Sequence, residues 1–121
     1  MTKLITKQNL PQSYLALLDN ELLNQEDQKT KAYQLCLEFL RGVDKTKRMN
    51  RFHTSYGYKH LVEGIPHRGY VYEGTFVMAA LDEGFTMKWL HPLSIKAVFN
   101  ISERSLKRRL KEWSPTYPCS I

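Results

Sequence analysis

Apolar side chains recur at helical spacing in short blocks, and each block stops at a glycine, a proline or a capping residue. The first block follows Asn9, which caps helices well, and Pro11, which fits a first helical turn. It predicts a helix over residues 11–23. A second block follows the polar link at 24–27, ends at Gly42 and predicts a helix of about four turns.

The short link predicts that these two helices form an antiparallel hairpin over residues 1–43, acting as a scaffold or a dimer contact. Residues 44–53 combine four cations with no apolar period, which is typical of a basic loop. Thr54 is then expected to cap a short helix that stops at Gly64. An extended piece is expected at 70–73.

A further helix is expected to begin at Gly74–Thr75 and to end at Gly84, a residue that suits a helix C-terminus. The loop after it carries Phe85 and Trp89, and both side chains are expected to fill the core. With the two N-terminal helices, this pattern predicts an all-helical chain.

Residues 92–111 have the pattern of a helix-turn-helix. Residues 92–99 are expected to form its first helix, and Asn100 suits the left-handed position of the turn. Ser102 is expected to cap the second helix, in which Leu106 and Leu110 lie four residues apart and face inward.

The predicted architecture is therefore all-α, with the N-terminal hairpin packed on the helix-turn-helix. At 121 residues, with 42% hydrophobic and 25% charged residues, the chain fits one domain, 1–121. Residues 54–112 are expected to form the part that contains the helix-turn-helix, and residues 113–121 a tail.

The sequence shows no apolar run that could cross a membrane and no secretory signal at its start, so a cytoplasmic location is expected. Cys36 is expected in the core, and Cys119 is expected to be exposed.

Positive charge is concentrated after the first third of the chain. Residues 1–44 carry five Lys or Arg against six Asp or Glu, whereas residues 45–121 carry thirteen against six. A one-sided positive field attracts polyanions, although the net charge of +6 also serves solubility. The distribution indicates nucleic acid, with duplex DNA favoured, as the partner.

The second helix of the predicted motif supplies the candidate binding residues. Its first turn would touch base edges and its later cations would hold phosphates, with further phosphate contacts from the basic loop. The candidates are Ser102, Arg104, Ser105, Lys107, Arg108 and Lys111 in the helix, and Lys45, Lys47, Arg48 and Arg51 in the loop. Two alternatives stay open: these cations complement their own helix dipole, or they contact a protein. The prediction requires that they project into solvent.

Two resemblances add to this interpretation. Residues 101–108, Ile-Ser-Glu-Arg-Ser-Leu-Lys-Arg, resemble the helix-turn-helix of bacterial regulators and resolvases, although Lys96 stands where those proteins usually have Ala. The segments 55–60, 70–85 and 99–102 are similar to small uncharacterised proteins of plasmids, phages and integrated elements. That resemblance implies a regulatory protein of a mobile element. A homodimer is expected if the target is a duplex site with two-fold symmetry, since one short helix makes a small interface. Alternatively, the resemblance implies a non-enzymatic factor that binds a host protein or nucleoprotein complex, such as an inhibitor of a host defence system.

Other kinds of site have weaker support in the sequence. His53, His60 and His67 are spaced by seven, but Gly64 and Pro66 interrupt any common helix, so we expect no metal site. A nuclease-like set (Tyr56, Tyr58, Lys59, His60 and Glu63) lacks converging carboxylates, so no catalytic residue and no enzyme activity are expected. Phosphate-binding glycine loops are absent, so no cofactor is expected. Stacking of single-stranded bases is a further alternative for Tyr56, Tyr58, Tyr70, Tyr72 and Trp89.

Overall fold

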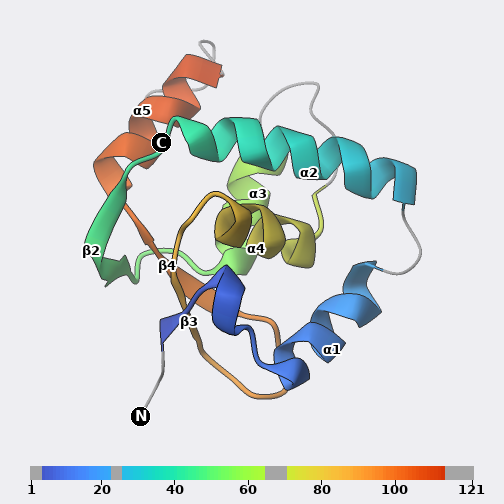
Figure 1. Ribbon diagram of the computed structural model, residues 1–121. Helices are drawn as coiled ribbons and strands as arrows, with labels where there is room; N and C mark the ends of the chain where they lie inside the picture. Colours follow the sequence, from blue (N-terminus) through green and yellow to red (C-terminus); the bar gives the residue numbers. More distant parts are fainter. Residues whose placement is uncertain (1–3, 23–25, 65–70, 114–121) are drawn as a thin grey trace.

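The protein folds as a four-stranded antiparallel sheet with helices packed on one face (Figure 1). The computed structural model describes residues 4–22, 26–64 and 71–113, and the side chains of 19–30 lie outside this description. The elements in chain order are β1 (Leu4–Ile5), a 3-10 turn (Lys7–Asn9), α1 (Gln12–Leu22), α2 (Glu26–Arg41), β2 (Lys45–Asn50), α3 (Ser55–Glu63), α4 (Glu73–Asp82), β3 (Met87–Trp89), β4 (Ala97–Ile101) and α5 (Glu103–Trp113). The architecture is mixed α/β, so the all-α prediction is wrong.

Apart from the helix expected over residues 92–99, the helices predicted from capping and periodicity are present in the described ranges. In α3, Oγ1 of Thr54 accepts a hydrogen bond from the Gly57 amide, which satisfies one free donor of the first turn. After α4, Gly84 has a φ of 88°, the left-handed geometry that favours glycine at a helix end. Local capping chemistry therefore places these boundaries correctly.

Helix α4 forms the centre of the molecule (Figure 1). Side chains all round it are buried, as expected of a helix enclosed by other elements. Phe76 of α4 stacks on Tyr58 of α3 and meets Phe99 of β4 edge-on, so these three rings join the helices to the sheet. The core has an aromatic centre.

Helices α1 and α2 both pack against α4, and Figure 1 shows them diverging from each other. The predicted antiparallel hairpin over residues 1–43 is therefore wrong in its packing, although both helices exist. Each of them packs instead against the central helix α4, which comes later in the chain.

Strand β4 replaces the first helix of the predicted helix-turn-helix. Ala97, Phe99 and Ile101 alternate along it and face the helices, which is the two-residue period of a strand. Asn100 lies within the strand, where its side chain accepts from the Thr86 amide and donates to the Thr46 carbonyl. It joins the two neighbouring segments, so the helix-turn-helix prediction is wrong.

The predicted basic loop is largely strand β2, an edge strand that pairs with β4. Lys45 pairs with Ile101 and Asn50 with Phe99, with a register shift between them. Charged side chains suit an edge strand because they discourage pairing with other chains. Backbone hydrogen bonds to β4 form this strand without the apolar alternation that would have predicted it.

The remaining predictions concern single residues and short segments, some of which lie outside the described residues. The expected extended piece at 70–73 is not a strand where the structure describes it, since Val71 and Tyr72 lead directly into α4. Phe85 and Cys36 are buried as expected, and Trp89 lies in β3 rather than a loop. Outside the described residues lie Pro66, His67, Tyr70, Cys119 and the tail from 114.

No helix in the described ranges is both long enough and apolar enough to cross a membrane.

Candidate nucleic-acid interface

Helix α5 is the predicted second helix, and its inner face fixes which residues face outward. Oγ of Ser102 accepts a hydrogen bond from the Ser105 amide at 3.2 Å, which caps the first turn as expected. Leu106 and Leu110 lie one turn apart and are both buried in the core. Because these leucines define the inner side, side chains opposite them must point to solvent.

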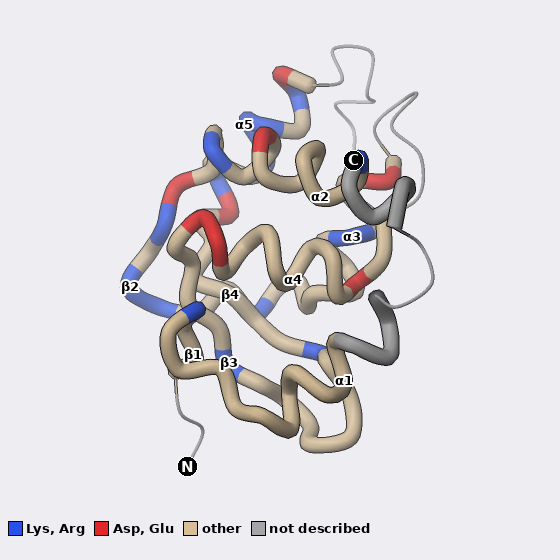
Figure 2. The backbone as a smooth tube through the Cα atoms, turned by 45° about the vertical axis from the view of Figure 1, so that its right-hand side comes forward, with Lys and Arg blue, Asp and Glu red and all other residues tan. Residues whose placement is uncertain are grey.

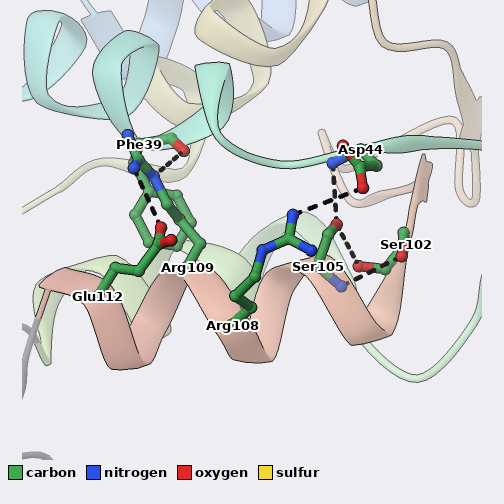
Figure 3. Close-up of polar contacts among 7 residues, drawn as sticks. All are labelled: Phe39, Asp44, Ser102, Ser105, Arg108, Arg109 and Glu112. Carbon is green, nitrogen blue, oxygen red and sulfur yellow. Dashed lines mark hydrogen bonds and ion pairs between the residues drawn. The ribbon is translucent and has the colours of Figure 1, made fainter.

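Ser105 does not join that outward face, because it is 1% exposed. Its hydroxyl accepts a hydrogen bond from the Asp44 amide at 2.8 Å and donates to the Ser102 carbonyl at 3.0 Å (Figure 3). The Ser102 amide in turn donates to the Asp44 carbonyl. Ser105 therefore fastens α5 to the start of β2, and its predicted contact with base edges has no exposed hydroxyl to support it.

Arg109 also turns away from solvent and caps a neighbouring helix. Its Nε donates to the Phe39 carbonyl at 2.9 Å (Figure 3). One terminal nitrogen donates to the Glu38 carbonyl at 2.6 Å. These carbonyls belong to the last turns of α2, where a cation complements the helix dipole. The guanidinium also lies 4.8 Å from the ring centroid of Trp113. Arg109 is thus a structural cation.

Four other cations of α5 are exposed. Arg104, Lys107, Arg108 and Lys111 line a shallow depression together with Glu112. Arg108 pairs with Asp44 at 3.5 Å between two largely exposed side chains, an arrangement worth little in water. Within the described ranges, the other three cations form no ion pair. The requirement that these cations project into solvent is met by all four.

The acidic residue at the start of α5 is directed away from this surface. Glu103 accepts hydrogen bonds from Asn50 Nδ2 at 2.8 Å and lies 3.0 Å from His53 Nε2. Burial raises the pKa of Glu103, but the hydrogen bonds from Asn50 and His53, with the charges of His53 and Lys107, outweigh it and leave the pKa below its usual value. Glu103 stays ionised and anchors the end of β2.

The cations of β2, together with Arg51 directly after it, divide into two groups. Lys47, Arg48 and Arg51 line a groove with Lys88 of β3. Lys45, by contrast, pairs with Ile101, whose side chain faces the helices, so Lys45 points to that face of the sheet as well. Its ammonium lies over the Phe85 ring, 4.6 Å from the centroid. Lys45 is exposed but lies apart from the groove.

The basic face comprises four exposed cations of α5 and three exposed cations that line the groove in β2 or directly after it: Lys47, Arg48, Arg51, Arg104, Lys107, Arg108 and Lys111. Figure 2 shows Lys and Arg following β2 and α5 on one side of the molecule. The hydrogen bonds of Ser105 and Ser102 to Asp44 hold the two elements in this relation. Of the ten predicted candidates, seven therefore lie on the basic face, whereas Lys45, Ser102 and Ser105 have structural contacts.

Sequence reasoning missed two residues of the groove. Both Phe52, which is 83% exposed, and Lys88 of β3 line it. The run Arg51–Phe52–His53, an aromatic between basic residues, is a signal that could have identified Phe52. Lys88 is isolated in the sequence, and only sheet register brings it there.

Most described residues of the nuclease-like and base-stacking sets have structural contacts. Lys59 is 4% exposed, and its ammonium donates to Glu63 and to the Val71 carbonyl, each at 3.2 Å. Glu63 also accepts from the Val71 amide, so this pair fixes the backbone that leads into α4. Tyr58 is buried, and burial with the nearby Glu103 charge raises its pKa. Trp89 packs edge-on against Tyr14. Tyr56, which also belongs to the predicted stacking set, is exposed.

Comparison of the chain with models of protein families, with curated proteins and with solved structures found no match. Function is therefore argued from the geometry and charge of the described residues.

Proposed function

We propose that the protein binds nucleic acid through the basic face. The observation that supports this is the gathering of seven exposed cations, from segments more than fifty residues apart in sequence, on two elements locked together by hydrogen bonds. Nucleic acids present a regular line of phosphate charges, and several cations held in fixed relation bind such a line better than one cation can.

The excess of cations over acids on this side of the molecule supports the same proposal. Glu103 is held by Asn50 and His53, and Glu112 pairs with Arg109. Asp44 is the acid paired with a cation of the basic face, through a long contact to Arg108. Glu103 is therefore engaged at the end of β2, whereas Glu112 and Asp44 lie beside the cations of α5. The seven cations of the basic face still outnumber these two acids.

In this proposal α5 contributes phosphate contacts rather than base recognition. A recognition helix of a helix-turn-helix is backed by a preceding helix that positions it in the major groove. Here the preceding element is the buried strand β4, and Ser105 in the first turn of α5 is buried. The exposed Arg104, Lys107 and Lys111 suit backbone contacts, which position a nucleic acid without reading its sequence.

The test is charge reversal with a matched control. Lys107→Glu/Lys111→Glu removes two cations of the basic face, and Lys31→Glu/Lys96→Glu removes two exposed lysines elsewhere, on α2 and between β3 and β4. Both double variants change the net charge equally. Fluorescence anisotropy with labelled oligonucleotides at fixed salt should show a clear loss of affinity for the first variant and little change for the second. Circular dichroism checks that both remain folded.

Equal affinities of the two variants would contradict the proposal, because binding would then follow net charge and not the basic face. No binding by the wild-type protein at low salt would contradict it as well.

A further inference from the structure

The groove beside β2 lies on the outer face of the sheet. Ile5, Met87 and Phe99 are opposite one another across β1, β3 and β4, and all three are buried against the helices. The next residues along these strands, Leu4 and Lys88, also pair directly and therefore point to the other face. Both line the groove, so it spans from β1 to β2 on the side away from the helices.

Among the residues that the structure describes, the lining combines cations with apolar surface and includes no acid. Lys47, Arg48, Arg51 and Lys88 supply four positive charges, and the remaining lining residues are apolar: Leu4, Met49 and Phe52. A polyanion whose units carry both a charge and a flat apolar surface matches this lining on both counts.

Phe52 is presented to solvent by a specific turn. Its amide donates to Oδ1 of Asn50 at 2.8 Å, while Nδ2 of the same Asn50 donates to Glu103 at the start of α5. Asn50 itself is 8% exposed, so the turn is fastened to the body of the protein. The contacts of the buried Asn50 therefore fix the turn that presents Phe52, and the 83% exposed side chain lines the cationic groove.

We infer that this groove binds single-stranded nucleic acid, with its cations on the phosphates and Phe52 stacked on an unpaired base. The inference deepens the proposed function and rests on it. An exposed ring among cations suits a single strand because every base offers a π face once it is unpaired. In a duplex those faces are covered by neighbouring base pairs, so Phe52 would have nothing to stack on.

The experiment compares Phe52→Ala with Phe52→Trp. The probes are labelled oligothymidine and oligouridine of about 12 nucleotides, a length suited to a small binding surface. A duplex probe of the same length is measured beside them. Phe52→Ala should weaken single-strand binding roughly 5- to 100-fold. It should leave duplex binding unchanged, and Phe52→Trp should retain single-strand affinity.

Two control variants remove exposed apolar side chains elsewhere. Tyr56 on α3 is 48% exposed and Leu93 between β3 and β4 is 81% exposed. Tyr56→Ala and Leu93→Ala should bind the single strands as the wild type does. Equal loss in these controls would overturn the inference, because the effect would then be general to surface hydrophobicity.

Three further results would overturn the inference. One is single-strand affinity unchanged by Phe52→Ala. The second is equal weakening of duplex and single-strand binding. The third is displacement of the oligonucleotide by polyglutamate at equal charge concentration, which would indicate an acidic protein as partner. If Lys107→Glu/Lys111→Glu still weakens binding in the first two cases, the proposed function stands and only the single-strand assignment fails.

Discussion

Glu103 shows how one residue links the fold to the basic face. It lies at the start of α5, accepts hydrogen bonds from the end of β2, and removes its own negative charge from the exposed helix surface. The same carboxylate holds Asn50, whose other side-chain atom fixes the Phe52 amide. Its ionisation should therefore contribute to the stability of the whole region.

Glu103→Gln should make the protein less sensitive to acid. Because the folded pKa of Glu103 lies below the ordinary value of 4.5, ionised Glu103 stabilises the fold above that pH, and this contribution is lost as pH falls through the folded pKa. The wild type should exceed the variant in free energy of unfolding by about 1 kcal/mol at neutral pH. Urea unfolding at a series of pH values should show that the difference disappears below the folded pKa. A difference that stays constant with pH would contradict this role.

At the scale of elements, α5 joins the sheet to α2 through Arg109 and Gly42. The guanidinium passes so close to Gly42 that a Cβ there would lie 2.5 Å from Arg109 Cζ. Gly42 needs no left-handed backbone, since its φ is not positive. The glycine is therefore required for the space that it leaves to the arginine, and not for its own conformation.

This close approach predicts coupling between two substitutions. Arg109→Ala should lower the free energy of unfolding by about 1–3 kcal/mol, because two carbonyls of α2 lose a charged donor. Gly42→Ala should also destabilise the wild type, by displacing Arg109. In the Arg109→Ala background it should cost little, which gives a coupling energy of about 0.5–3 kcal/mol in a double-mutant cycle from urea unfolding. Additive effects would show that the contact is not what requires glycine.

The orientation of α5 gives a second prediction at this scale. Leu106→Ala should lower the free energy of unfolding by about 2–5 kcal/mol, since it leaves a cavity in the core. Lys107→Ala, one residue further along, should change it by no more than about 0.5 kcal/mol. Thermal or urea unfolding of the two variants measures this contrast. Similar costs would mean that the helix faces the core differently.

The sequence predicted the helices better than the strands, for identifiable reasons. Leu106 and Leu110 fix α5 because one face of a single helix is enough to show the period. Residues 92–99 were expected to form a helix, whereas Ala97, Phe99 and Ile101 of β4 carry the two-residue period that the structure uses. For so short a segment both periods are present, and only pairing with neighbouring strands decides between them.

At the scale of the molecule, the basic face depends on contacts between distant segments. Seven of the ten predicted cationic and polar candidates lie on it, because charge excess after the first third of the chain is visible in the sequence. The groove was not predictable in the same way. Lys88 reaches it through its register opposite Leu4, and Phe52 through a turn held by Asn50 and Glu103. Such juxtapositions exist only after the sheet has formed.

The measurement that tests the central claim most directly is the salt dependence of oligonucleotide binding to the wild-type protein. If three to five of the exposed cations displace counterions, the logarithm of the affinity should fall with the logarithm of salt concentration at a slope of about −3 to −5. Lys107→Glu/Lys111→Glu should give a shallower slope, and Lys31→Glu/Lys96→Glu should keep the wild-type slope. A flat response in the wild type, or the same slope in all three proteins, would contradict binding of nucleic acid through the basic face.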